Sequence, residues 1–289
     1  MNRKDFIKKS TVLSAIGLSS PVLLKGNSNP KTSTYYKLKD QIGFNHIPNN
    51  EIKTMNSVVH KANTRGHADH GWLKANHSFS FANYFDPERM QFGALRVLND
   101  DTIAPGMGFG THPHDNMEIV TIPLEGALEH KDSMDNVGVI SSNEIQVMSA
   151  GTGIYHSEYN HHKDQAAKIL QLWVFPNSEN VTPRYDQMSI DSLRKKNSLY
   201  QVVSPNPNDA GMWIHQQAWF YLGEFDQDTS FAYEMNKEKN GVYAFVIDGH
   251  FTIDQHPLER RDALGVSETD SFEIEAKKGS KILTIEVPM

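Results

Sequence analysis

The apolar residues of this chain fall into short runs whose spacing favours β-strands over helices. The runs are rich in β-branched and aromatic residues and are bounded by Gly, Asp, Asn or Pro, a texture typical of an all-β sandwich or barrel. The predicted strands include residues 92–98, 118–124, 137–141, 145–148 and 169–175, and then 200–203, 218–224, 242–247, 251–253 and 281–287. One short helix is predicted at 189–197, and the pair Asp248-Gly249 between two apolar runs predicts a β-hairpin.

Polar stretches divide the chain into four parts. A stretch rich in Asn, Ser, Thr and Lys precedes residue 55 and has the composition of a linker. A second polar stretch, PNSENVTPRYDQ, contains two prolines and separates two β domains of similar size. The predicted parts are an export signal at 1–25, a linker at 26–54, an N-terminal β domain at 55–180 and a C-terminal β domain at 181–289.

The first 25 residues have the layout of a secretory signal. Basic residues (Arg3, Lys4, Lys8 and Lys9) precede a mildly apolar stretch at 11–24. Residues 2–8 resemble the twin-arginine export signal, with lysine in place of the second arginine, and no clear Ala-x-Ala cleavage site follows. We expect export to the periplasm; the alternative is an N-terminal tail on a cytoplasmic protein.

Composition and charge exclude several classes of function. The 289 residues carry 28 Lys and Arg against 35 Asp and Glu, a net charge of −7, and no basic block tracks a phosphate backbone, so no direct nucleic-acid partner is expected. No apolar run reaches the roughly 18 residues of a membrane-spanning helix. The chain has no cysteine and 14 histidines, so any metal ion must be held by nitrogen and oxygen ligands.

Two glycine-rich segments carry the candidate chemistry. GMGFGTHPHDNMEIV begins at Gly106 and contains His112 and His114; SAGTGIYHSEYN begins at Ser149 and contains His156 and Glu158. Residues i and i+2 of a strand point to the same face, so each pair would project into one barrel. A single His-x-His is a weak signal, but the second pair with a carboxylate predicts a site for one divalent transition metal. Three imidazoles and one carboxylate suit Fe(II), Mn, Co, Ni, Cu or Zn.

The same segments resemble the two cupin motifs. Gly106-x5-His112-x-His114-x3-Glu118, with Gly126 closing a hairpin, follows the first motif with a final spacing one residue longer than usual, and Gly151-x-Gly153-x2-His156-x3-Asn160 follows the second. More specifically, the chain is similar to the pirin family of two-domain cupins. The similar stretches are GHADHGWLKANHSFSFANYFDP from Gly66, GFGTHPHDNMEIVT from Gly108, LEGALEHKDS from Leu124 and MSAGTGIYHSEYN from Met148.

The resemblance implies a fold and a set of ligands. The fold would be two cupin barrels (double-stranded β-helix, or jelly roll) with few short helices, and the metal would lie in the first barrel only. The implied ligands are His112, His114, His156 and Glu158. Glu118 occupies the usual cupin glutamate position and is the alternative carboxylate. We favour Glu158 because it shares a strand face with His156.

The resemblance also implies an activity. Pirin-like quercetinases are metal-dependent dioxygenases that open a flavonol ring with O2 and release carbon monoxide, so a small aromatic substrate, O2 and one metal, Fe(II) first, are expected. Glu158 would be both ligand and catalytic base for the flavonol hydroxyl. The alternatives are a metal-loaded regulatory module without turnover and a cupin that acts on another small molecule. A monomer is expected.

Other residues receive lesser roles. His67, His70 and His77 are interpreted as structural or rim histidines, and His161 and His162 as solvated loop residues. His130 and Asp132 are placed in a hairpin without a role. The aromatic side chains near residue 80 are interpreted as core or as the lining of an aromatic-binding pocket; they are Trp72, Phe79, Phe81, Tyr84 and Phe85.

Overall fold

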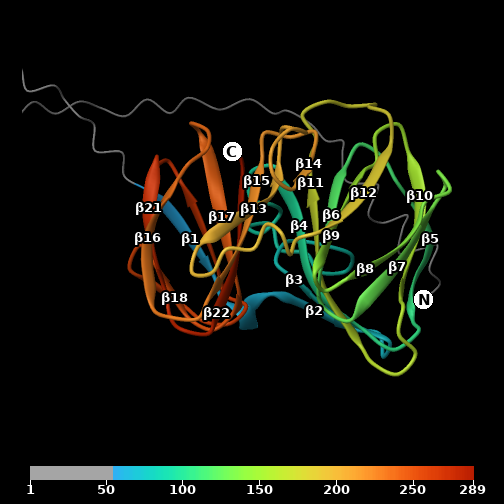
Figure 1. Ribbon diagram of the computed structural model, residues 1–289, viewed down its shortest axis with the longest axis horizontal. Helices are drawn as coiled ribbons and strands as arrows, with labels where there is room; N and C mark the ends of the chain where they lie inside the picture. The colour runs from blue at the N-terminus through green and yellow to red at the C-terminus, as the bar shows by residue number, and fades with distance from the viewer. Residues whose placement is uncertain (1–54) are drawn as a thin grey trace, which may run out of the picture. The chain divides into compact units, whose positions relative to one another are not determined.

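Two β-barrels lie side by side in the computed structural model, which describes residues 55–289 (Figure 1). The strands of the first barrel are β2 (Gly66–Asp69), β3 (Leu73–His77), β4 (Leu95–Ile103), β5 (Gly108–His114), β6 (Glu118–Glu125), β7 (Ala127–Asp132), β8 (Val137–Ser141), β9 (Glu144–Ser149), β10 (Ile154–Asn160), β11 (Ala167–Val174) and β12 (Arg184–Ser189). Those of the second are β1 (Asn56–His60), β13 (Leu199–Ser204), β14 (Met212–Trp213), β15 (Trp219–Phe225), β16 (Thr229–Glu234), β17 (Asn240–Asp248), β18 (Phe251–Ile253), β19 (His256–Leu258), β20 (Ala263–Ser267), β21 (Ser271–Ala276) and β22 (Ser280–Pro288). The all-β prediction is confirmed.

Helical structure in the described residues is limited to one 3-10 turn, Ala62–Thr64. The helix predicted at 189–197 is wrong. Buried Ile190 anchors a single turn, closed by the Leu193 amide on the Ile190 carbonyl (3.0 Å). Asn197 then takes a positive φ of 55°, which a continuing helix does not allow. No helix in these residues is long and apolar enough to cross a membrane, and residues 1–25 and 26–54, the predicted signal and linker, lie outside them.

The two barrels have the same topology, which the sequence did not reveal. Each contains a large sheet and a four-stranded sheet, and all pairings but β13–β14 are antiparallel. The central order β9-β6-β11-β4 in the first large sheet matches β20-β17-β22-β15 in the second, and the small-sheet order β5-β10-β7-β8 matches β16-β21-β18-β19. Strands β16 and β21 therefore occupy in the second barrel the places of β5 and β10 in the first.

Two predicted hairpins are wrong for one shared reason. Strand β6 bonds to β9 and β11 whereas β7 bonds to β8 and β10, so the turn at Gly126 carries the chain from one sheet to the other. The turn at Asp248-Gly249 does the same between β17 and β18. Both glycines have φ of 77°, a conformation that a tight hairpin and a sheet-changing corner require equally. The turn residues therefore predict the turn but not the strand with which the next strand pairs.

The barrels exchange strands across the predicted domain limits. Strand β1, from the start of the described chain, pairs with β20 of the second barrel, while β12, beyond residue 180, pairs with β9 of the first. Each barrel thus includes a strand from outside its own predicted range. The exchange ties the two barrels together through backbone hydrogen bonds as well as side-chain packing.

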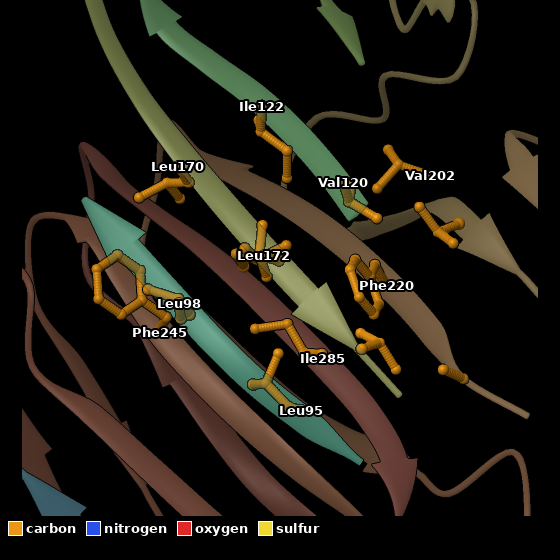
Figure 2. Packing of buried hydrophobic residues seen from close by; sticks show 14 of the residues in the cluster. Leu95, Leu98, Val120, Ile122, Leu170, Leu172, Val202, Phe220, Phe245 and Ile285 are labelled. Carbon is orange, nitrogen blue, oxygen red and sulfur yellow. The ribbon is translucent and has the colours of Figure 1, made fainter. Parts of the chain in front are cut away.

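The main core lies between the two large sheets (Figure 2). Along β6, β11, β17 and β22 one side chain in two points to this core, as expected for strands with two buried faces. Figure 2 shows both contributions: Leu95, Leu98, Val120, Ile122, Leu170 and Leu172 from the first barrel, and Val202, Phe220, Phe245 and Ile285 from the second. The small sheets, including β5 and β10, cover the far side of each barrel.

A buried histidine in β1 makes stability depend on pH. His60 Nδ1 lies 2.9 Å from the Tyr243 hydroxyl, and burial, with a smaller effect of Arg89, lowers the pKa of His60 from 6.5 to about 4. In the unfolded chain His60 binds a proton near pH 6.5, whereas in the folded protein it does so only near pH 4. The free energy of unfolding therefore falls as the pH falls from 6.5 to about 4. The loss is about 1.4 kcal/mol per pH unit for one such group.

Urea unfolding of metal-free protein at pH values from 7 to 4 measures this effect. His60→Gln is expected to give a shallower fall in the free energy of unfolding, whereas His250→Gln, at an exposed site, is expected to reproduce the wild-type slope. Equal slopes for wild type and His60→Gln would contradict the assignment.

Candidate metal centre

Three histidines converge on the inner face of the first barrel's small sheet. The ring centroids of His112 and His156 lie 4.4 Å apart, those of His112 and His114 5.0 Å, and those of His114 and His156 4.9 Å. Each ring offers one nitrogen, and the three nitrogens lie within 4.8 Å of one another. Strands β5 and β10 are antiparallel neighbours with His156 opposite His112, and this pairing brings the three histidines together.

The local sequence explains why these strands present their histidines inward. On β5, Thr111 and Pro113 are exposed and alternate with the half-buried His112 and His114. Strand β5 is the edge of its sheet, a position that tolerates proline although proline has no N–H to donate. Gly108 faces β10 so closely that a Cβ there would collide with the Glu158 carbonyl, so glycine is required for the two strands to approach.

The hydrogen bonds of the cluster leave ligand nitrogens free. His112 Nδ1 is 2.8 Å from the Gly110 carbonyl, which can only accept, so this nitrogen carries the proton and Nε2 is free. His156 Nε2 is buried and has no hydrogen-bond partner among the described residues. Such an orphaned nitrogen, beside two further imidazoles, fits a metal ligand better than a structural histidine.

Electrostatics keep these imidazoles in the form that binds metals. Burial and, next, His112 lower the pKa of His156 to about 2. Burial and then His156 hold the pKa of His114 well below its usual range. Both rings are therefore neutral at physiological pH, as metal coordination requires.

Glu158 lies beside the cluster rather than at its centre. It is buried on the same face of β10 as His156, and both of its carboxylate oxygens accept from Gln171 Nε2 (3.0 and 2.9 Å). Its oxygens group with nitrogens of His156 and His130 but not with those of His112 and His114. A register shift between His156 and Glu158 places Glu158 opposite Phe109. Asp101 is close enough that burial, Asp100 and Glu158 raise the pKa of Asp101 well above its usual range.

Glu118 belongs to a different environment. It begins β6 on the face that carries Val120 and Ile122, which points to the second barrel, and its Oε2 accepts from Ser149 Oγ (2.8 Å). No group of metal-ligating side chains in the described residues includes it. His114 and Glu118 do not share a strand face, because the chain leaves the small sheet after β5 and enters the large one at β6.

The other histidines divide into surface and buried positions. His67 and His70 are exposed, whereas His77 is buried with its Nδ1 2.8 Å from Asn99 Oδ1. His161 forms an exposed pair with Glu129 (3.5 Å). His130 is the residue that the sequence analysis missed: it is fully buried and its Nδ1 lies 3.4 Å from His156 Nδ1. The i, i+2 relation of His130 to Asp132, the same pattern used for His112 and His114, would have signalled it.

The aromatic side chains near residue 80 do not form one lining. Phe79 is in the core between the sheets and Phe85 is exposed. Phe81 packs edge-on against Trp173, whose ring lies 4.8 Å from that of His114. Two members of this group reach the histidine cluster through one intervening ring: Phe81 through Trp173, and Trp72 through Phe109, whose centroid lies 5.3 Å from that of Trp72 and 6.4 Å from that of His112.

The corresponding strands of the second barrel carry no such cluster. Their inward side chains are apolar and belong to a second hydrophobic core: Phe231 and Tyr233 on β16, and Phe272, Ile274 and Ala276 on β21. Within residues 55–289, the groups of side chains able to hold a metal all lie in the first barrel.

Comparison with known proteins agrees with this division. Residues 58–174 match the Pirin family, and residues 201–287 match the Quercetinase C-terminal cupin domain. Over 230 residues the chain is 42% identical to a protein of Escherichia coli (strain K12) named Quercetin 2,3-dioxygenase, covering 80% of this chain and 98% of that one. It is 35% identical over 222 residues to a Pirin-like protein of Caulobacter vibrioides, covering 76% of this chain and 95% of that one.

A solved relative carries a metal. The crystal structure of the bacterial pirin YhhW from Escherichia coli in complex with nickel(II) has a TM-score of 0.76 and 39% identity, covering 81% of this chain and 99% of that chain. The expected pair of cupin barrels is confirmed. The histidine cluster has the composition and spacing of a site for a divalent metal ion.

Proposed function

This chain belongs to the pirin family, and from that premise we propose that it is a metal-dependent dioxygenase that opens a flavonol ring with O2 and releases carbon monoxide. One observation carries the proposal: three imidazoles present nitrogens within 4.8 Å of one another on the inner face of the small sheet. We propose His112, His114, His156 and Glu158 as the ligands. Fe(II) is the first candidate, and Ni, Mn, Co, Cu and Zn are compatible with the same donors.

The chain's own residues divide the chemistry among them. A bound divalent metal supplies Lewis acidity toward the flavonol oxygens and the redox capacity that dioxygen chemistry needs. His112, His114 and His156 would hold the ion through their ring nitrogens. Glu158 accepts the proton of the flavonol 3-hydroxyl at one carboxylate oxygen while Gln171 Nε2 keeps donating to the other. The proton returns to the carboxylate of the ring-opened ester as the product leaves.

Full-length protein loaded in turn with Fe(II), Mn, Co, Ni or Cu tests the activity. Quercetin loss and carbon monoxide release are followed in air. Turnover that depends on the metal and disappears in His114→Ala supports a dioxygenase. Tight stoichiometric metal binding without turnover of quercetin or other flavonols would contradict the proposed reaction and leave a metal-loaded binding protein.

The two candidate carboxylates are separated by amide substitutions of equal size. Glu158→Gln is expected to lower turnover by about 100-fold or more, within the range of about 10²–10⁴ for general base catalysis, and to weaken metal binding. Glu118→Gln is expected to keep the metal and the turnover, because Glu118 faces the other barrel. Metal titration and steady-state kinetics of both variants measure this. The reverse pattern would assign the metal to the usual cupin glutamate.

We also propose that residues 1–25 direct export and that the protein works as a monomer. Export is supported by the basic and apolar pattern of those residues alone. Cell fractionation is expected to place the protein in the periplasm, and replacing Arg3 and Lys4 with Gln is expected to retain it in the cytoplasm. Light scattering on the eluted peak is expected to give the mass of one chain, and a dimer mass would contradict the monomer.

A further inference from the structure

The buried His130 and Asp132 lie directly behind the proposed ligand His156. Strand β7 pairs with β10, with Asp132 opposite His156 and His130 opposite Glu158. The His130 side chain is fully buried, and its ring stacks on that of Tyr185 with centroids 4.5 Å apart and planes 25° apart. The function proposed above gives this histidine no part, and a fully buried imidazole in polar contact on both sides calls for one.

The hydrogen bonds form a single chain from Asp132 to His156. His130 Nε2 is 3.3 Å from Asp132 Oδ2, and His130 Nδ1 is 3.4 Å from His156 Nδ1. Asp132 is itself fixed: its Oδ1 accepts from the Met134 and Asn136 amides (2.8 and 3.1 Å), and its Oδ2 accepts from Asn136 Nδ2 (2.9 Å). The carboxylate therefore cannot turn away from His130.

With one proton on each imidazole, one order of protons fits these contacts. An ionised carboxylate only accepts, so His130 carries its proton on Nε2 and presents an unprotonated Nδ1. His156 then donates Nδ1–H to that nitrogen. A neutral His156 with its proton on Nδ1 has a bare Nε2, the atom left without a partner and the one whose ring faces His112 and His114. The chain from Asp132 thus selects the tautomer that a metal ion requires.

We infer that Asp132 and His130 form a positioning relay that fixes the tautomer and orientation of His156 for metal binding. The inference rests on the proposed metal site. His130, His156 and Glu158 each offer a ligand atom within 4.8 Å of the other two, so His130 has an alternative role as a metal ligand. The relay is favoured because both nitrogens of His130 face other partners, whereas the free nitrogen of His156 faces away from it.

Substitutions of His130 test whether its Nδ1 accepts the hydrogen bond from His156 Nδ1–H. The leucine of His130→Leu fills the space but cannot accept a hydrogen bond. This variant is expected to bind Ni(II) about 10–100-fold more weakly in chelator competition. His130→Asn places an amide oxygen near the position of Nδ1, and it is expected to lose less than tenfold. His161→Leu, at an exposed histidine, is the matched control and is expected to change nothing. Equal, wild-type affinities for all three variants would overturn the relay.

Asp132→Asn tests the proton order without a change of shape. The Met134 and Asn136 amides hold the amide oxygen at the Oδ1 position, so the new NH2 group faces His130 Nε2. It donates where the carboxylate accepted, which reverses the tautomers of His130 and then His156. The Asn136 Nδ2 donor loses its acceptor in this variant, so circular dichroism of the metal-free protein checks that it stays folded. We expect a loss of about 10–100-fold in Ni(II) affinity from the folded variant.

Nitrogen-15 NMR of histidine-labelled, Zn(II)-loaded protein reports the tautomers directly. The relay predicts a proton on His156 Nδ1 and on His130 Nε2 in the wild type. A metal-shifted His130 nitrogen would make it a ligand and overturn the relay. If the wild type binds no metal, the site and the proposed function fail; if it binds one metal but every variant binds equally well, the site stands and only the relay fails.

Discussion

Replacing His156 with alanine is expected to abolish stoichiometric metal binding and flavonol turnover while leaving both barrels folded. His156 belongs to both groups of side chains that can hold an ion, so its loss leaves neither group with three members. The loss of affinity should exceed the roughly 10–100-fold that removal of an outer hydrogen-bond partner costs. The fold should survive because the main core between the large sheets does not include this residue.

Metal content per chain by mass spectrometry, with far-UV circular dichroism as the check on folding, measures this result. His161→Ala serves as the control, because the imidazole of His161 is exposed. One equivalent of metal retained by folded His156→Ala protein would remove the basis for the ligand assignment and for the proposed reaction together.

The inward-facing histidines of β5 and β10 could be predicted from the sequence because alternation along a strand decides which side chains share a face. Alternation along β5 and β10 alone brings His112, His114 and His156 to one face, and the pairing of the two strands completes the cluster. Proline at the edge of the sheet follows from the same chemistry. These features depend on residues a few positions apart, which is the range over which side-chain direction is fixed by backbone geometry.

Features that depend on which strands pair could not be predicted from the local sequence. Gly126 and Gly249 make similar turns whether the next strand pairs with the previous one or crosses to another sheet, so the hairpins were predicted wrongly. The pairing of β1 with β20 joins residues about 200 positions apart, and no local pattern carries that information.

The interiors of the two barrels show how one topology serves two purposes. Strands β10 and β21 occupy equivalent places, but β10 turns His156, Glu158 and Asn160 inward whereas β21 turns Phe272, Ile274 and Ala276 inward. The polar interior carries orphaned groups that weaken the first barrel as a folding unit. Shared packing against the second barrel offsets this cost, since the two large sheets form one core.

A buried ionic cluster at the junction of the barrels gives the largest expected effect on stability. Asp100 on β4 accepts from Arg65 Nη1 (3.1 Å) and from Arg261 Nε (3.0 Å), and both arginine side chains are less than a tenth exposed. Both guanidinium groups lie near the Phe245 ring, at 5.8 and 6.0 Å from its centroid. One carboxylate of the first barrel thus pairs with two cations that have little access to water.

Asp100→Ala is expected to lower the free energy of unfolding by about 3–5 kcal/mol, because removing one partner leaves uncompensated buried charge. Urea unfolding at neutral pH measures it. Glu125→Ala, which breaks the exposed pair with Lys168 (2.8 Å), is the matched control and should cost less than about 1 kcal/mol. The triple replacement of Asp100, Arg65 and Arg261 by apolar residues should recover much of the loss, since no charge then remains buried. If Asp100→Ala costs no more than the control, water must reach the two arginines, and the junction between the barrels would be held by the apolar core and the exchanged strands without help from this ionic cluster.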